Sequence, residues 1–227
     1  MLTSSDLPIS CMLFDLDGTL VDTAPDLVNA LNAVLHQEGL TPYPLDQIRP
    51  TVSHGTVAML NHAFGNSQPE IDFKRRQQVF LDYYLANICV QSQLFTGMSL
   101  LLNTLQTKGI PWGVVTNKPH YLTVPLMRAL GLIEQASSIV SGDTLSVAKP
   151  HPEPLLLAAQ QCGVNPTECL YIGDAQRDII AGQRAGMRTV VAQYGYLSAA
   201  DLMEDWQADF RIQAPIELLR FINGTQA

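Results

Sequence analysis

The stretch "CMLFDLDGTLVDTAP" (residues 11–25) joins an apolar run to two aspartates, Asp15 and Asp17, which are one residue apart and are followed at once by Gly18. The apolar run is typical of a buried strand. Two carboxylates at the end of such a strand repel each other and lose hydration, which costs free energy unless another group compensates their charge. We therefore expect a binding or catalytic site directly after this strand.

Short apolar segments alternate with amphipathic segments along most of the chain. The amphipathic segments have the period of helices, and several end at a glycine that suits a helix C-terminus. Strands that alternate with helices predict a doubly wound α/β fold, in which helices cover both faces of a parallel sheet. The expected strands are residues 9–14, 111–117, 136–142, 169–174 and 188–193, and the expected helices are 99–109, 125–132, 152–163 and 176–186.

Residues 23–95 depart from this alternation. They contain three segments with a helical pattern, at 24–40, 55–65 and 70–89, and no strand is expected between them. A helical block after the first strand indicates a second, smaller domain. We predict an all-helical cap over residues 21–95, inserted into an α/β catalytic core of residues 1–20 and 96–227.

The composition limits the classes of function. The 227 residues are 47% hydrophobic and 15% charged, as in a globular protein with a core of its own. A formal net charge of -8 argues against binding to nucleic acid or to an anionic membrane surface. No apolar run approaches transmembrane length, and no signal peptide is evident. The four cysteines lack CxxC spacing, so we expect a cytoplasmic protein with reduced cysteines. The sequence does not indicate an oligomeric state, so a monomer and a homodimer are both open.

Polar residues follow several of the predicted strands. Because ligands bind at the carboxyl ends of parallel strands, these side chains are expected to meet at one edge of the sheet. Their carboxylate oxygens favour Mg²⁺. A nucleophilic carboxylate, a proton donor and a lysine suit the transfer of a phosphoryl group. The residues concerned are Asp15, Asp17, Thr116, Asn117 and Asp174 at strand ends, and Lys149 and Asp178 in the adjoining loops.

Four motifs occur in order along the chain, namely "DLDGTLVDT", "VVTNKP", "AKPHPEP" and "YIGDAQRD". In this order and at this spacing they resemble the four motifs of the haloacid dehalogenase superfamily, and the resemblance covers essentially the whole chain. The helical insertion between the first two motifs is similar to the cap of subfamily I. The resemblance implies a Rossmann-like core, a phosphatase that acts on a small phosphorylated acid or sugar phosphate, and Mg²⁺ as cofactor.

The resemblance also implies the roles of the two aspartates in the first motif. Asp15 is then the nucleophile that becomes an aspartyl phosphate. Asp17 is the general acid for the leaving alcohol and afterwards the base for the attacking water. Members that displace halide need no proton donor at this position, and transport ATPases carry threonine there. An aspartate at this position therefore predicts turnover by hydrolysis.

The other motif residues are expected to bind the phosphoryl group and the metal. By the resemblance, Thr116 and the backbone of Asn117 hold phosphoryl oxygens, and Lys149 neutralises charge. The glycine Gly18 lets the backbone amides approach the ligand closely. Mg²⁺ is then held by the Asp15 side chain, the Asp17 carbonyl and Asp174, while Asp178 supports Lys149 or a metal-bound water.

Substrate choice is expected to lie in the cap, within "RPTVSHGTVAML" (residues 49–60). Ser53 is predicted to cap the following helix, whose free amides would bind a substrate carboxylate, and Arg49 would add positive charge. The specificity candidates are Arg49, Ser53, His54 and Gly55. A plain helix N-terminus without a binding role remains an equally open interpretation.

Other polar residues are expected to take no part in the chemistry. Asp22 is interpreted as a turn residue. Lys118 is expected to be exposed to solvent, and Arg75 and Arg76 are interpreted as a solvated helix face.

Two groups of phosphatases within the superfamily resemble the chain. The segments "DLDGTLVDTAPDL", "GVVTNKP", "KPHPEPLLLAA" and "YGY" (194–196) are similar to phosphoglycolate phosphatases, although "VSHG" departs from their cap-loop pattern. The segments "VQSQLFTGM", "PWGVVTNKP" and "YGYLSAADLMEDWQAD" are similar to N-acetylmuramic acid 6-phosphate phosphatases. The first group implies hydrolysis of 2-phosphoglycolate and the second a role in cell-wall recycling. Both substrates remain open.

Two other classes of protein share features of this sequence, namely phosphoacceptor signalling domains and phosphate-binding regulatory proteins. A phosphoacceptor signalling domain shares the sheet and the acidic pocket, but it would be about half as long and would have no cap. A phosphate-binding regulatory protein of the same fold would not need both Asp15 and Asp17. Replacement of Asp15 by asparagine should abolish turnover in an enzyme and leave the fold intact.

Overall fold

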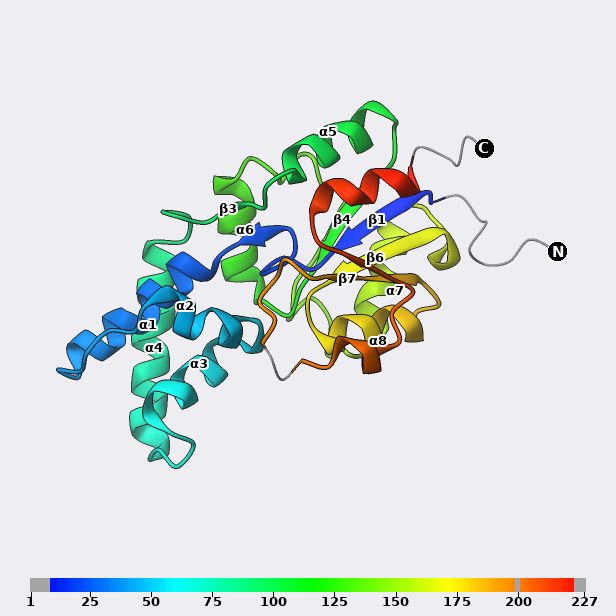
Figure 1. Cartoon of the computed structure of the whole chain (residues 1–227). Coiled ribbons are helices and arrows are strands. Elements are labelled where there is room, and N and C mark those ends of the chain that lie inside the picture. Colours follow the sequence, from blue (N-terminus) through cyan, green and yellow to red (C-terminus); the bar gives the residue numbers. More distant parts are fainter. Residues whose placement is uncertain (1–8, 199–200, 223–227) are drawn as a thin grey trace.

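The computed structural model describes residues 9–198 and 201–222, and it contains one six-stranded parallel sheet (Figure 1). The predicted core ranges 1–20 and 96–227 therefore include residues 1–8, 199–200 and 223–227, which lie outside the described part. The strand order is β5-β4-β1-β6-β7-β8, so the prediction of a doubly wound α/β fold is confirmed. The strands are β1 (Cys11–Phe14), β4 (Trp112–Val115), β5 (Ser138–Val140), β6 (Cys169–Gly173), β7 (Arg188–Ala192) and β8 (Phe210–Ile212).

Strand β1 lies in the middle of the sheet because its side chains are apolar on both faces. Met12 and Phe14 pack into one hydrophobic cluster with α5 (Met98–Thr107) and α6 (His120–Ala129). Cys11 and Leu13 pack into another cluster with α7 (Glu153–Gln161) and α8 (Gln176–Arg184). Successive residues of a strand point to opposite faces, so one apolar run supplies both layers. The chain then adds β4 and β5 on one side of β1 and β6 to β8 on the other, which opens a crevice at the carboxyl end of β1.

Helix α6 begins earlier than its sequence predicts. A helix was expected over residues 125–132. Instead α6 begins at His120, and Pro125 lies inside it, where it cannot donate the usual backbone hydrogen bond. Leu122 and Leu126 of α6 are buried, at 4% and 0% exposure. Burial of this apolar face offsets the lost hydrogen bond.

Between β1 and β4 the chain forms a helical insertion (residues 21–95), whose apolar residues form a hydrophobic cluster that also includes Leu122 and Tyr196. Short strands β2 (Val21–Asp22) and β3 (Gln93–Leu94) pair antiparallel at its two ends. The sequence pattern predicts no strand in this range. Strands β2 and β3 could not be predicted because each has only two residues and forms only by pairing with a distant segment. The helices are α1 (Ala24–Gln37), α2 (Leu45–Ile48), the 3₁₀ helix η2 (Arg49–His54), α3 (Gly55–Phe64) and α4 (Glu70–Ala86).

The C-terminal part adds an edge strand that the sequence pattern does not reveal. Strand β8 pairs with β7 in parallel, yet its three residues include only one that is fully buried. The other 3₁₀ helices of the described chain are η3 (Pro166–Glu168), η4 (Met203–Trp206) and η5 (Pro215–Phe221). All four cysteines are free. None of the helices in residues 9–198 and 201–222 combines the length and the apolar character that crossing a bilayer requires.

Candidate active site

The loop after β1 carries both aspartates of the first motif. Asp15 is 3% exposed, and its Oδ1 accepts the next backbone N–H at 2.7 Å. Asp17 Oδ1 accepts a hydrogen bond from Thr23 Oγ1 at 2.6 Å. Gly18, which follows Asp17, has φ +84°, and a Cβ at this position would lie 2.3 Å from Asp174 Oδ2. A glycine is therefore required both by the backbone conformation and by the close approach of a carboxylate.

Lys149 lies behind Asp15 with its side chain 1% exposed. Its Nζ is 2.9 Å from Asp15 Oδ1 and 2.8 Å from Asp178 Oδ1. The same ammonium donates to the backbone carbonyl of Val115 at 2.8 Å and to the Tyr171 hydroxyl at 2.9 Å. These contacts fix one positive charge beside two buried carboxylates, which compensates the charge of Asp15 from the first motif.

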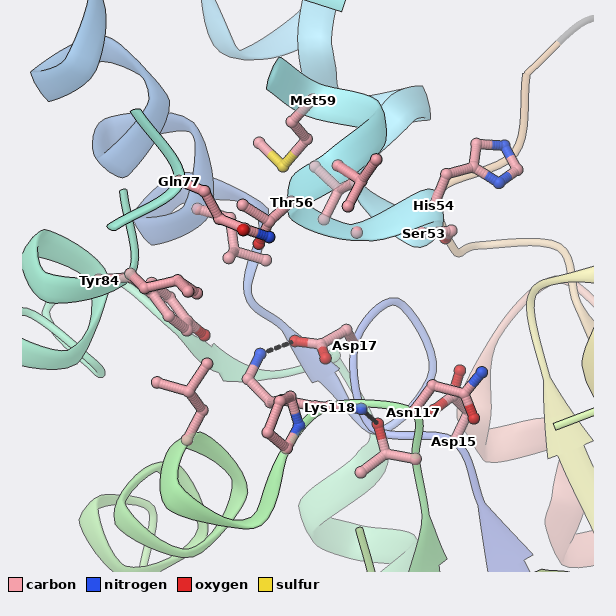
Figure 2. A pocket seen from close by; sticks show the side chains of 18 of the residues that line it. Asp15, Asp17, Ser53, His54, Thr56, Met59, Gln77, Tyr84, Asn117 and Lys118 are labelled. Atoms are coloured by element: carbon pink, nitrogen blue, oxygen red, sulfur yellow. Dashed lines mark hydrogen bonds and ion pairs between the residues drawn. The ribbon is translucent and has the colours of Figure 1, made fainter. Parts of the chain in front are cut away.

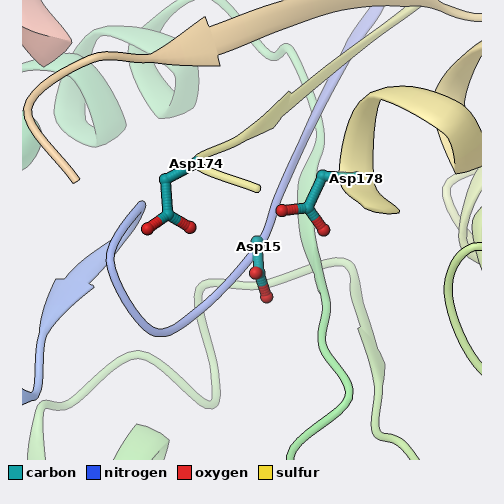
Figure 3. Close-up of side chains that lie close together, drawn as sticks. All are labelled: Asp15, Asp174 and Asp178. Carbon is teal, nitrogen blue, oxygen red and sulfur yellow. The ribbon is translucent and has the colours of Figure 1, made fainter. Parts of the chain in front are cut away.

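Three carboxylates, those of Asp15, Asp174 and Asp178, converge at this position (Figure 3). One oxygen of each lies within 4.8 Å of the others. Burial, followed by the charges of Asp15 and Asp178, raises the pKa of Asp174 to about 7. The cluster thus holds more negative charge than Lys149 compensates, and its donors are hard oxygens. Both properties fit a magnesium ion.

Asp178 has a second contact that its position in the first turn of α8 explains. Its Oδ2 accepts the backbone N–H of Ala175 at 3.0 Å, which satisfies one of the unpaired donors at the helix N-terminus. The residue is fully buried. Asp178 therefore stabilises the helix start and contacts Lys149 at the same time.

Thr116 and Asn117 follow β4 at the same edge of the sheet. The Asn117 side chain accepts the backbone N–H of Lys149 at 3.0 Å and donates to its carbonyl at 2.9 Å. Thr116 Oγ1 accepts the backbone N–H of Lys118 at 3.1 Å. The second and third motifs are thus joined by hydrogen bonds, as the parallel topology leads one to expect.

The expectation that Lys118 is exposed to solvent is wrong. Its side chain is 6% exposed, and its Nζ is 2.7 Å from Asp17 Oδ1 (Figure 2). The ring of Tyr84, from α4, covers it with 4.7 Å between Nζ and the ring centroid. Burial alone would lower the pKa of Lys118, but the charge of Asp17, its hydrogen bond and the interaction with Tyr84 together outweigh burial and raise the pKa. Lys118 is therefore a charged residue of the site.

A pocket of about 460 Å³ opens between the helical insertion and the edge of the sheet (Figure 2). Asp15 and Asp17 are the acidic residues that line it within the described chain. Of the other predicted site residues, Thr116, Asn117, Ser53, His54 and Gly55 also line the pocket, whereas Gly18, Arg49, Lys149, Asp174 and Asp178 do not. The remaining wall is largely apolar, with Leu27, Val52, Val57, Met59, Leu81 and Leu122 among its residues.

Ser53 and Arg49 have different partners from those that the sequence predicts. Helix α3 has no side-chain hydrogen bond at its N-terminus, so Ser53 does not cap it. The Ser53 hydroxyl instead donates to Asp174 Oδ2 at 2.7 Å, because the 3₁₀ turn η2 points it toward the sheet edge. Arg49 forms two hydrogen bonds of 3.0 Å with Asp22. Asp22 is therefore an ion-pair partner at the base of the insertion, beyond its expected place in a turn.

The two arginines of α4 differ in exposure. The Arg75 side chain is 51% exposed, as expected for a solvated helix face. The Arg76 side chain is only 16% exposed, since its guanidinium lies 4.1 Å from the centroid of Phe64 and pairs with Glu38 at 3.2 Å. The expectation of a solvated face is wrong for Arg76.

Comparison with known protein families shows which family the chain belongs to. The family model of haloacid dehalogenase-like hydrolases matches residues 12–192, which include all four motifs. The chain belongs to this family. The haloacid dehalogenase resemblance drawn from the motifs is thereby confirmed.

Relatives of this haloacid dehalogenase-like hydrolase carry two phosphatase names. A phosphoglycolate phosphatase of Xanthomonas campestris pv. campestris is 44% identical over 210 residues, which cover 91% of this chain and 93% of the relative. An N-acetylmuramic acid 6-phosphate phosphatase of Pseudomonas aeruginosa is 40% identical over 211 residues, covering 93% of each chain. A solved structure described as a predicted phosphoglycolate phosphatase, from Haemophilus somnus, is similar with a TM-score of 0.82 and 28% identity. It covers 97% of this chain and 99% of its own. The predicted phosphatase agrees with these names.

Three further residues of this hydrolase were not singled out from the sequence. Arg177 lines the pocket with its Nη2 3.9 Å from Asp15 Oδ2, and its place in "YIGDAQRD" was the available signal. Burial raises the pKa of Tyr84 to about 12, so its hydroxyl stays protonated in the pocket wall. The Tyr196 hydroxyl accepts two backbone N–H groups at the start of α1, at 2.6 and 2.9 Å, and donates to Asp22 at 2.9 Å. No local pattern marks Tyr84, and Tyr196 was noted only within the "YGY" segment (194–196) without a role, because both residues act through partners that are distant in the sequence.

Proposed function

We propose that the chain is a Mg²⁺-dependent hydrolase of phosphate monoesters that acts through a covalent aspartyl phosphate on Asp15. One observation carries this proposal. Asp15 and Asp17 both open onto the pocket, whereas the lysine that compensates Asp15 lies buried behind it. A carboxylate held in this way has its free oxygen available to a phosphorus atom, and a second carboxylate stands beside it for proton transfer.

The reaction has two steps with the same acid and base. Asp15 attacks phosphorus while the bond to the leaving oxygen breaks, and Asp17 donates its proton to that oxygen. Asp17 then takes a proton from a water molecule that attacks phosphorus, so that phosphate leaves and the carboxylate of Asp15 is restored. Thr116 and the backbone of Asn117 bind the phosphoryl oxygens, and the nearby guanidinium of Arg177 adds positive charge.

Asp15, Asp174 and the Asp17 carbonyl would hold the magnesium ion, with Asp178 beside them. When bound, this ion neutralises negative charge on the phosphoryl group and on the carboxylates that face it. The support for this assignment is the cluster of buried carboxylate oxygens within 4.8 Å of one another. Burial raises the pKa of Asp15, and the ammonium of Lys149 opposes this rise, so Lys149 favours the ionised carboxylate and orients it through its contacts with Asp15 and Asp178.

We further propose that the helical insertion acts as a cap on a core made of residues 1–20 and 96–227. Ser53, His54 and Gly55 line the pocket opposite the aspartates, and these residues would contact the part of the substrate beyond the phosphate. Arg49 does not line the pocket and is paired with Asp22. We therefore leave it out of the proposed specificity residues. The four free cysteines support a cytoplasmic location.

Two substrates follow from the names of the relatives. 2-Phosphoglycolate is proposed because relatives of 43% and 44% identity carry the name phosphoglycolate phosphatase. N-Acetylmuramic acid 6-phosphate is the second candidate, and the size of the pocket favours it. A volume of about 460 Å³ lies within the range of about 300–1,000 Å³ for pockets that enclose larger ligands, and it far exceeds a glycolyl group.

Initial rates on both substrates, with magnesium and with EDTA, test the proposal. We expect phosphate release that EDTA abolishes, with a preference for one of the two compounds. Asp15→Asn should eliminate turnover, whereas Asp46→Asn, at an exposed position of α2, should retain it. Absence of magnesium-dependent phosphate release from either substrate and from an aryl phosphate would refute the phosphatase assignment.

A further inference from the structure

Two donors hold the same oxygen of Asp17. Thr23 Oγ1 is 2.6 Å from Asp17 Oδ1, and Lys118 Nζ is 2.7 Å from it. Thr23 lies at the start of the helical insertion, and Lys118 lies in the loop after β4. Neither donor contacts Oδ2, which leaves this second oxygen for the reacting groups. The rotation of the Asp17 carboxylate is thus set by one contact from the insertion and one from the sheet edge.

The position of Lys118 depends in turn on the helical insertion. A lysine side chain is long and flexible, and it loses considerable rotational freedom when it is fixed. Tyr84, from α4, is fully buried and places its ring 4.7 Å from Lys118 Nζ. The face of an aromatic ring attracts an ammonium group, and the ring also excludes water from the ion pair with Asp17. Figure 2 shows Lys118 between Tyr84 and Asp17, on the wall of the pocket.

We propose that Lys118 is the positioning residue for Asp17, an inference that rests on the proposed phosphatase function. Tyr84 holds Lys118 in place when the helical insertion lies against the sheet edge. The ion pair fixes Oδ1, so that Oδ2 carries the proton to the leaving oxygen and later removes a proton from the attacking water. Because Tyr84 comes from the insertion, Asp17 is aligned only while the insertion covers the pocket. The acid and base step is thereby coupled to closure over the substrate.

An alternative role for Lys118 is direct binding of the phosphate, and the leaving group separates the two roles. An alkyl phosphate has a poor leaving group that requires the proton of Asp17, whereas p-nitrophenyl phosphate has a good one that does not. Loss of a phosphate contact lowers kcat/KM equally for both compounds. Loss of Asp17 alignment lowers kcat/KM mainly for the alkyl phosphate.

The experiment compares kcat/KM for p-nitrophenyl phosphate and for the better alkyl substrate of the wild type, either 2-phosphoglycolate or N-acetylmuramic acid 6-phosphate. We expect Lys118→Met to reduce the alkyl value at least about tenfold more than the aryl value, as general acid catalysis contributes about 10²–10⁴ in rate. Lys118→Arg should recover most of the loss, since it keeps the charge. Tyr84→Leu should show the same selective loss, and Tyr84→Phe, which retains the ring, should not.

Lys74→Met serves as the matched control, because Lys74 is 67% exposed on the same helix as Tyr84. Equal losses on the two substrates in Lys118→Met, or no loss, would overturn the inference. If Lys118→Met does not fold, the selective loss in Tyr84→Leu decides in its place, and equal losses there overturn the inference in the same way. A wild type that hydrolyses none of the compounds would instead contradict the proposed phosphatase function.

Discussion

Replacement of Lys149 by methionine removes the ammonium group that contacts both Asp15 and Asp178. The methionine side chain has a similar length, so packing changes little and the charge is the main loss. The side chains involved are 1%, 4% and 0% exposed, so water does not screen the remaining carboxylates. Removing one partner of a buried ion pair costs about 3–5 kcal/mol, because the charge left behind is uncompensated.

Urea unfolding of the wild type and the variant, both in EDTA, measures this loss. For a slope of about 2–3 kcal/mol per molar urea, the midpoint should fall by about 1–2.5 M. Lys108→Met, at an exposed position after α5, should change the free energy of unfolding by less than about 0.5 kcal/mol. A second variant that also carries Asp178→Asn should recover part of the loss, since one uncompensated carboxylate is then removed.

The outcome that refutes this reasoning is a loss below about 1 kcal/mol in Lys149→Met, the size of an exposed ion pair. Strict additivity of Lys149→Met and Asp178→Asn would contradict it as well. Side chains 2.8 Å apart that share a buried ion pair should instead show coupling of about 0.5–3 kcal/mol.

Three further perturbations have expected outcomes. Gly18→Ala should lower the melting temperature more than Gly39→Ala. Both glycines have positive φ, but only at Gly18 would the new Cβ clash with Asp174, at 2.3 Å. Equal decreases in melting temperature would contradict the clash. Because the pKa of Asp174 is raised to about 7, protons compete with Mg²⁺ near and below that pH, and calorimetric Mg²⁺ affinity should be about fivefold weaker at pH 6 than at pH 7; a pH-independent affinity would be inconsistent with this. Tyr196→Phe removes the acceptor of the Thr23 backbone N–H and leaves the Ala24 N–H only its 3.4 Å contact with Asp22, so it should cost about 1–3 kcal/mol in thermal unfolding. Tyr83→Phe, at an exposed tyrosine, should cost little.

The motif residues were predictable because the topology of a parallel sheet brings strand ends together. Asp15, Thr116 and Asp174 are far apart in the sequence, yet each directly follows a strand of the same sheet. Apolar runs identified those strands. Because ligands bind at the carboxyl ends of parallel strands, the residues after these strands could be predicted to lie in one site. Strand β8 escaped prediction because an edge strand of three residues, only one of them buried, has no distinctive pattern.

The environment of Lys118 could not be predicted for a different reason. Its neighbours Asn117 and Pro119 are typical of an exposed loop, and nothing within reach in the sequence indicates burial. The Tyr84 ring that covers it comes from a helix more than thirty positions earlier. The same holds for Ser53, whose partner Asp174 is 121 residues away. Local patterns indicate which elements form, whereas such contacts depend on how two packed units meet.

The short ribbon of β2 and β3 has a consequence for how enzymes of this shape diversify. Val21 is paired with Leu94 and Asp22 with Gln93, so the chain leaves the sheet and returns to it at neighbouring points. A segment with adjoining ends can be exchanged for another of different length without altering the route of the remaining backbone. Evolution can therefore change the substrate specificity by replacing the inserted segment at β2 and β3. The residues at the sheet edge that break the phosphate ester need not change at the same time.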